Sequence, residues 1–187
     1  GEEGEHHKPE RRQPREVTEV LDLACGHGLV GLLLAYRFPR LRVVCADSSR
    51  RRFWNAYVEA WRAKGKPARE NDTPLLNVEH QVSRLEDVPV QSTSVVVGIH
   101  ACNEANLRLL ERARAARSPW VIMPCCIPEG LYLPHARFHH LRDEERYPAV
   151  VGAIAAIFGA ERVAGIDQRI TNRHLLVMGD AAASQQM

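Results

Sequence analysis

The sequence lacks any apolar run long enough to cross a lipid bilayer, so we expect neither a membrane-spanning segment nor a membrane partner. It also lacks an excess of charge of one sign, because 25 Lys and Arg against 23 Asp and Glu leave a net charge of +2. That balance neither requires nor opposes a nucleic-acid partner. No internal repeat is present. What remains is a globular chain of 187 residues, long enough for one domain with a sizeable core.

Spaced cysteine pairs of the C-x₂₋₄-C type are absent as well, which disfavours a structural zinc module. The five cysteines, an odd number, are Cys25, Cys45, Cys102, Cys125 and Cys126. This usage is typical of a reduced, intracellular protein, either cytoplasmic or organellar with its targeting peptide removed. Residues 1–15 are charged and contain prolines, so we expect a disordered leader before a domain at 16–180 and a tail at 181–187.

A strand, a glycine-containing turn and a helix are predicted in direct succession at residues 20–31, which read VLDLACGHGLVG. Small residues at such a junction allow a ligand to approach the backbone N–H groups at the positive end of the helix. About twenty residues later, a second apolar strand at 42–46 ends in Asp47, which is placed to accept hydrogen bonds from a ribose diol. The sequence therefore predicts a site for a nucleoside-type cofactor.

Two cofactors fit this turn. Gly26-x-Gly28-x-x-Gly31 is the dinucleotide fingerprint and leaves an NAD-dependent oxidoreductase as one alternative. Asp22-x-Ala24-x-Gly26-x-Gly28 resembles motif I, D/E-x-G-x-G-x-G, of the class I methyltransferases that use S-adenosylmethionine (SAM). A carboxylate before the turn repels a pyrophosphate but attracts the ammonium group of a methionine moiety, which favours SAM. Ala24 stands where that family has glycine, and its methyl group is tolerated if φ stays negative.

The order of the predicted elements indicates an α/β fold. Strands are expected at 16–24, 42–46, 76–82, 93–99, 120–123, 162–170 and 174–179, and helices at 29–38, 49–64, 104–117 and 147–158. This order predicts a Rossmann-like, mostly parallel seven-stranded sheet with helices on both faces and a C-terminal antiparallel hairpin. Such an ending is similar to the seven-stranded methyltransferase fold and argues against a second βαβ half. The helix at 29–38 is apolar nearly all round, so we expect it to be buried.

The helix expected at 49–64 carries an aromatic stripe. Phe53, Tyr57 and Trp61 recur at i, i+4 and i+8, a spacing that predicts core packing. Ser48 or Ser49 is expected to cap its N-terminus.

Two groups of arginines lie near the predicted turns. Arg50, Arg51 and Arg52 follow the second strand, and Arg169 and Arg173 lie in the expected C-terminal hairpin. Each group is either a solvated surface or a contact for phosphate, and the sequence leaves both open.

A more particular resemblance rests on His100-Ala101-Cys102 after the fourth strand and Cys125-Cys126 after the fifth. These residues resemble a methyltransferase branch that has an H-x-C-G segment and a later C-C pair. The branch includes the acceptor-stem tRNA ribose 2′-O-methyltransferase and the proteins with a glutathione-S-transferase-like C-terminal domain. The resemblance covers about residues 17–128, with Asn103 where the branch has glycine and no appended zinc finger in this sequence.

The resemblance implies a SAM-dependent methyltransferase that modifies RNA, either tRNA or rRNA. The alternatives are a small-molecule or protein methyltransferase and a catalytically degenerate module that binds SAM or a partner. We expect a monomer.

Cofactor contacts are expected where the first four strands end. The residues concerned are Asp22, Ala24, Cys25, Gly26, His27, Gly28, Asp47, Ser48, Arg84, Leu85, Asp87 and His100. By resemblance, Leu85 and Asp87 would bind adenine, and Arg84 takes a position where methyltransferases commonly have Asp.

Catalytic candidates follow the fourth and fifth strands, namely His100, Cys102, Asn103, Cys125 and Cys126. His100 is either a general base or a histidine bonded to backbone. Three interpretations of the cysteines stay open. They could ligate zinc together with His100, attack a pyrimidine ring as in the RNA 5-methylcytosine enzymes, or pack the floor of a pocket. The third is favoured, so no metal is expected.

Overall fold

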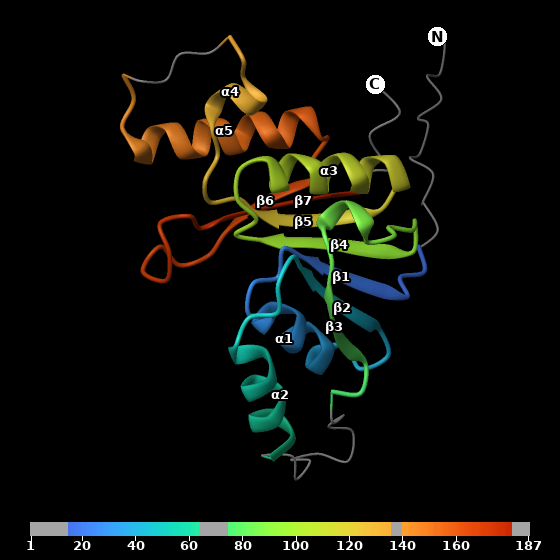
Figure 1. The fold of residues 1–187 in the computed structure, drawn as a ribbon. Coiled ribbons are helices and arrows are strands. Elements are labelled where there is room, and N and C mark those ends of the chain that lie inside the picture. Colours follow the sequence, from blue (N-terminus) through green and yellow to red (C-terminus); the bar gives the residue numbers. More distant parts are fainter. Residues whose placement is uncertain (1–14, 64–74, 136–139, 181–187) are drawn as a thin grey trace, which may run out of the picture.

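The computed structural model describes residues 15–63, 75–135 and 140–180 (Figure 1). The strands are β1 (Glu19–Leu23), β2 (Arg42–Asp47), β3 (Val78–Val82), β4 (Ser94–Ile99), β5 (Pro119–Met123), β6 (Arg162–Gly165) and β7 (Leu175–Asp180). The helices are α1 (Leu29–Arg37), α2 (Phe53–Ala63), the 3₁₀ turn η1 (Leu85–Asp87), α3 (Glu104–Ala116), α4 (Glu129–Tyr132) and α5 (Asp143–Ile157). Of the predicted leader only residue 15 is described, and the predicted tail lies wholly outside the described residues. Within the described ranges, no helix has the length and apolar character needed to cross a membrane.

The seven strands form one sheet in the order β3-β2-β1-β4-β5-β7-β6. The first five pair in parallel, and β7 runs antiparallel to both β5 and β6. The predicted fold class is therefore confirmed. The chain starts at β1 in the middle of the sheet, runs outward to β3 and returns to β4, so the strand order reverses between β1 and β4. Ligands of open α/β sheets bind at such a point, beyond the carboxyl ends of the strands.

Side chains that alternate along the strands supply two cores, one on each face of the sheet. Val20 and Val43 pack in the core beneath α1 and α2, whereas Leu21 and Val44 pack in the core beneath α3 and α5. Figure 1 shows α1 and α2 on one side of the sheet and α3, α4 and α5 on the other. Burial on both faces explains why the central strands β1, β2, β4 and β5 are mostly apolar.

The expected burial of α1 is confirmed on the side that faces the sheet but not on its outer side. Its sheet-facing side, with Leu32 and Ala35, is fully buried, but Leu29, Leu33 and Tyr36 are 46%, 48% and 42% exposed. Helix α2 packs against α1, with Tyr36 next to Trp61, but it leaves this outer stripe half open.

The start of α2 and its aromatic core were also predicted imperfectly. The helix begins at Phe53, four residues later than predicted, so neither Ser48 nor Ser49 is close enough to cap it. The Ser49 N–H instead donates to the Asp47 carboxylate. Trp54 is the buried aromatic side chain, while Phe53 is exposed and Tyr57 and Trp61 are half-buried.

The C-terminal hairpin has a longer loop than predicted. Strand β6 ends at Gly165, and residues 166–174 form a loop before β7. Asp167 accepts a hydrogen bond from the Arg169 N–H over 2.9 Å. A carboxylate that bonds the backbone two residues later favours a turn over a strand, which explains the early end of β6.

Candidate functional site

The turn after β1 has left-handed backbone geometry at three positions. Ala24, Gly26 and Gly28 have φ values of 55°, 57° and 75°. A Cβ at Gly26 would meet nothing within 4 Å, so the space beside the turn is open to a ligand. A Cβ at Gly28 would lie 2.5 Å from the Trp54 ring, so Gly28 is required by packing. The sequence suggested that alanine at position 24 would be tolerated if its φ were negative, but φ is positive there. Ala24 is therefore held in a conformation that favours glycine.

Asp22 of β1 is buried, and its side chain lies beside the first turn of α1. Its side chain is 1% exposed, and its Oδ2 accepts the Gly31 N–H over 2.9 Å. Burial raises its pKa to about 7, the Gly31 hydrogen bond opposes that rise, and the charge of Asp47 adds to it. In this structure the carboxylate supports the first turn of α1, and its contact with an ammonium group stays a prediction.

Gly31, the third glycine of the fingerprint, allows α1 to approach the sheet. A Cβ there would lie 2.1 Å from the Cys45 Sγ and 3.1 Å from the Asp22 Oδ2. This glycine is therefore explained by helix–strand packing.

Asp47 joins the ends of three strands. Its Oδ2 accepts the Gly26 N–H over 2.9 Å, and its backbone oxygen accepts the Ser83 N–H over 3.0 Å. Its Oδ1 lies 3.3 Å from both the Ser48 Oγ and the Ser49 N. Each carboxylate oxygen has two lone pairs, so the half-buried side chain keeps capacity to accept further bonds. Its contact with a ribose stays a prediction.

The turn after β3 places the candidate adenine residues next to α3. Arg112 donates to the backbone oxygen of Glu86 over 2.6 Å, which fixes η1 against that helix. Leu85 is half-buried against the core, and Asp87 is exposed. The Arg84 side chain is 75% exposed and forms an ion pair with Glu86 at 3.6 Å.

The loop after β4 is strained at two residues. His100 has φ 58°, and Asn103 has φ 52° with ψ −128°, both positive for non-glycine residues. The His100 N–H donates to the Met123 oxygen and the Asn103 N–H to the Cys126 oxygen, each over 2.9 Å. Asn103 occupies the predicted N-cap position of α3, but its side chain makes no capping hydrogen bond. Two backbone bonds thus hold this loop against the segment after β5.

The structure brings together three of the predicted cysteines. The Sγ atoms of Cys102, Cys125 and Cys126 lie within 4.8 Å of one another, and Cys102 and Cys125 are separated by 2.8 Å. The His100 backbone oxygen accepts from Cys102 over 3.4 Å and from Cys125 over 3.6 Å.

Of the three thiols, Cys102 and Cys126 are exposed and Cys125 is half-buried, and the interpretation that they pack the floor of a pocket stays a prediction. Burial, followed by the hydrogen bond with Cys102, raises the pKa of Cys125 to about 12, which disfavours a free thiolate nucleophile at that position. Among the described residues, the ring of His100 is not grouped with the three thiols closely enough to share a metal ion with them.

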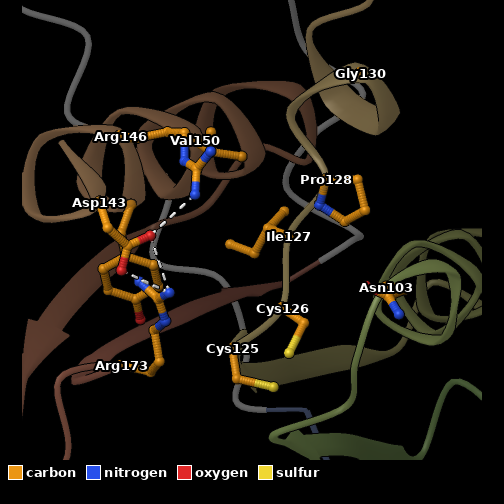
Figure 2. Close-up of a pocket in the computed structure, with 11 residues that line it drawn as sticks. Asn103, Cys125, Cys126, Ile127, Pro128, Gly130, Asp143, Arg146, Val150 and Arg173 are labelled. Carbon is orange, nitrogen blue, oxygen red and sulfur yellow. Dashed lines mark hydrogen bonds and ion pairs between the residues drawn. The ribbon is translucent and has the colours of Figure 1, made fainter. Parts of the chain in front are cut away.

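A cavity of about 520 Å³ lies beyond the end of β5 (Figure 2). Its lining includes Asn103, Cys125, Cys126 and Ile127 on one side and Tyr147 of α5 on the other. In Figure 2 the two cysteines lie at one end of the cavity and the charged side chains at another.

The charged wall of this cavity is built on Asp143. Asp143 pairs with Arg146 at 3.1 Å and with Arg173 at 2.8 Å, and the Arg173 guanidinium lies 4.8 Å from the centre of the Tyr147 ring. The Arg173 hydrogen bond is the main cause that lowers the pKa of Asp143. Arg173 therefore lies at the site, whereas Arg169 pairs with Asp167 in the exposed loop.

Sequence reasoning missed two buried residues near the carboxyl edge, His80 and Asn106, and placed Trp54 only beside the aromatic stripe of α2. Trp54 and His80 pack edge to face at 5.0 Å, and the Cys25 Sγ lies 3.9 Å from the His80 Nε2, so these rings support the turn from behind. Asn106 of α3 is fully buried, and in the described part of the chain neither of its amide atoms has a hydrogen-bond partner. The aromatic pattern of α2 was a signal for Trp54, but nothing marked His80 or Asn106.

Comparisons with known proteins agree with this architecture. A family model described as a methyltransferase domain matches residues 6–129. The glutathione S-transferase C-terminal domain-containing protein of Xenopus laevis is 28% identical over 107 residues, which are 57% of this chain. This chain spans 16% of the length of that relative.

Two solved structures share the fold. The fibrillarin/Nop5p complex has a TM-score of 0.55 and 14% identity, with coverage of 91% of this chain and 75% of that chain. The 16S rRNA methyltransferase KamB has a TM-score of 0.53 and 14% identity, with coverage of 89% and 88%. The methyltransferase-domain match over residues 6–129 and the antiparallel β7 set aside the NAD-dependent oxidoreductase.

Proposed function

We propose, because this chain belongs to the methyltransferase-domain family of class I SAM-dependent enzymes, that it transfers the methyl group of SAM to RNA. One observation carries the proposal. Asp47, bonded to the Gly26 N–H at the cofactor turn, is followed within three residues by the exposed run Arg50, Arg51 and Arg52. A nucleoside-binding carboxylate and a group of cations for phosphate thus lie at one edge of the sheet.

The residues around the turn fit SAM. The open space at Gly26 admits the methionine moiety beside the backbone N–H groups, and Asp47 would accept bonds from the ribose hydroxyls. Leu85 and Asp87 would bind adenine. The buried charge of Asp22 would act on the ammonium group through the low-dielectric turn.

The arginine run supports an RNA acceptor. In the part of the chain that the structure describes, Arg50, Arg51 and Arg52 form no ion pair with an acidic side chain. Arg50 donates to the His80 backbone oxygen over 3.1 Å, and Arg52 lies over the Phe53 ring. Their charges are therefore available to RNA phosphates, which dominate the affinity of nucleic-acid binding.

Bound SAM supplies an electrophilic methyl group on its sulfonium. The chain's own contribution is to hold the acceptor in line with that group, since orientation alone provides a large part of the rate. The cavity beyond β5 would receive the acceptor. His100, exposed at the end of β4, would take the proton of a hydroxyl acceptor.

The test is transfer of labelled methyl from SAM into total cellular RNA. We expect label that ribonuclease releases and protease does not. Replacement of Arg50, Arg51 and Arg52 by Gln should reduce transfer and lower the salt dependence of RNA binding by about two to three units of log–log slope. The matched control replaces three other exposed arginines, Arg40, Arg62 and Arg162, by Gln.

Label that resists ribonuclease would contradict the RNA proposal and favour a protein or small-molecule acceptor. A second candidate, a SAM-binding module without catalysis, is favoured by one observation, the strained Ala24 at a glycine position of the motif. That candidate predicts tight SAM binding with no transfer to any fraction of an extract.

A further inference from the structure

Three thiols from two separate segments converge at the carboxyl edge of the sheet. Cys102 follows β4, while Cys125 and Cys126 follow β5, and their Sγ atoms lie within 4.8 Å of one another. Two of the three side chains are exposed and the third is half-buried. The proposed methyl transfer does not require any of them.

The backbone holds this group in place. The 2.9 Å bonds from the His100 N–H to Met123 and from the Asn103 N–H to Cys126 fix the β4 loop against the segment after β5. His100 and Asn103 keep positive φ values within that loop, a conformation that persists only where surrounding contacts enforce it. Strained backbone around convergent thiols is typical of a site rather than of ordinary packing.

The chemistry of the group selects its ligand. Thiolates are preferred ligands of zinc, with Zn–S distances of about 2.3 Å and tetrahedral geometry, which together place sulfur atoms about 3.8 Å apart. All the Sγ–Sγ distances in the group are 4.8 Å or less, a range that includes 3.8 Å. The Sγ atoms of Cys102 and Cys125, which lie 2.8 Å apart, would have to separate by about 1 Å to bind the ion.

We propose that Cys102, Cys125 and Cys126 form a zinc site with three thiolate ligands and a fourth coordination position open to the cavity beyond β5. Cys125 and Cys126 both line that cavity, so water or a ligand in it can reach the ion (Figure 2). Each thiol gives up its proton to solvent on binding, so up to three protons leave for each zinc ion bound. No oxidant or reductant takes part.

The first test titrates the reduced full chain with Co²⁺ and then Zn²⁺. We expect one Co²⁺ per chain with an intense sulfur-to-cobalt charge-transfer band, displaced by Zn²⁺, and a release of about two to three protons per Zn²⁺ measured in buffers of different ionisation enthalpy. Substitution to Ser at Cys102, Cys125 or Cys126 should each weaken binding about tenfold or more. The matched control, Cys25→Ser, removes a half-buried thiol outside the group and should keep wild-type affinity.

A second test needs no variant, in case a substitution unfolds the chain. Alkylation of the wild-type protein with and without Zn²⁺, read by peptide mass spectrometry, should show all three thiols protected and Cys25 unprotected. Absence of the charge-transfer band, protection of fewer than three thiols, or formation of a Cys102–Cys125 disulfide that Zn²⁺ does not prevent would overturn the proposal. Neither test measures methyl transfer, so failure of one proposal is distinguishable from failure of the other.

Discussion

The backbone N–H of Gly26 donates a 2.9 Å hydrogen bond to Oδ2 of Asp47, so the turn after β1 and the end of β2 form one unit. The bond orients the carboxylate with its remaining lone pairs available and fixes the turn beside open space. A single side chain therefore joins the places where the methionine moiety and the ribose of the cofactor are expected.

Ala24→Gly should stabilise the protein. Ala24 has φ 55°, a left-handed conformation that costs a residue with a Cβ more than it costs glycine. We expect the free energy of unfolding to rise by about 1 kcal/mol in urea denaturation. Ala56→Gly in α2 is the control and should lower it by about 1 kcal/mol, because that exposed alanine lies in the interior of a helix. An equal decrease of the unfolding free energy in both variants would contradict the left-handed backbone geometry of the turn.

Asp22→Asn should change how stability depends on pH. The folded-state pKa of Asp22 is raised from 3.8 to about 7, so its favourable contribution is fully present below about pH 4 and is lost as pH rises through 7. Between pH 5 and pH 8 the wild type should lose about 2 kcal/mol relative to the Asn variant. Denaturation at four pH values measures this difference.

Asp167→Asn is the matched control for this titration. The pKa of Asp167 is lowered, chiefly by its hydrogen bond with Arg169, so its contribution is present above 3.8 and lost only in acid. The unfolding free energy of the Asp167 variant should change with pH in the same way as that of the wild type from pH 5 to pH 8. If the unfolding free energy of the Asp22 variant also follows that of the wild type, the buried carboxylate is not the titrating group.

Asn103→Gly should relieve strain in the loop after β4. The torsions φ 52° and ψ −128° favour glycine, and the Asn103 side chain makes no capping bond that would be lost. We expect an increase in unfolding free energy of about 1 kcal/mol and an unchanged circular dichroism spectrum. A decrease would show that the Asn103 amide makes a stabilising contact.

Much of the sheet could be predicted because its central strands β1, β2, β4 and β5 are buried on both faces and therefore consist mostly of apolar residues. The convergence of Cys102 with Cys125 also follows from the sequence, since both residues come directly after neighbouring parallel strands. The extent of β6 could not be predicted, because Asp167 directs its carboxylate to the Arg169 N–H and turns the chain.

Other features depend on contacts between distant residues. The open stripe on α1 reflects how little of that helix α2 covers, which no local pattern reveals. The cavity combines Cys125 with Tyr147 and Arg173, which are separated by tens of residues in the sequence. Likewise, the sign of φ at Ala24 is set by the bonds that close the turn, not by the residue itself.

The most direct test of the central claim is calorimetric titration of SAM into the wild type and Asp47→Asn. The structure predicts that SAM binds the wild type and that the variant binds it at least about tenfold more weakly, since bonds to a charged acceptor contribute about 1.5–3 kcal/mol. Glu79→Gln, which removes an exposed carboxylate of β3 that pairs with Arg42, should bind as the wild type does. Equal affinity of the wild type and the Asp47 variant, or no binding of SAM by the folded wild type, would contradict the account.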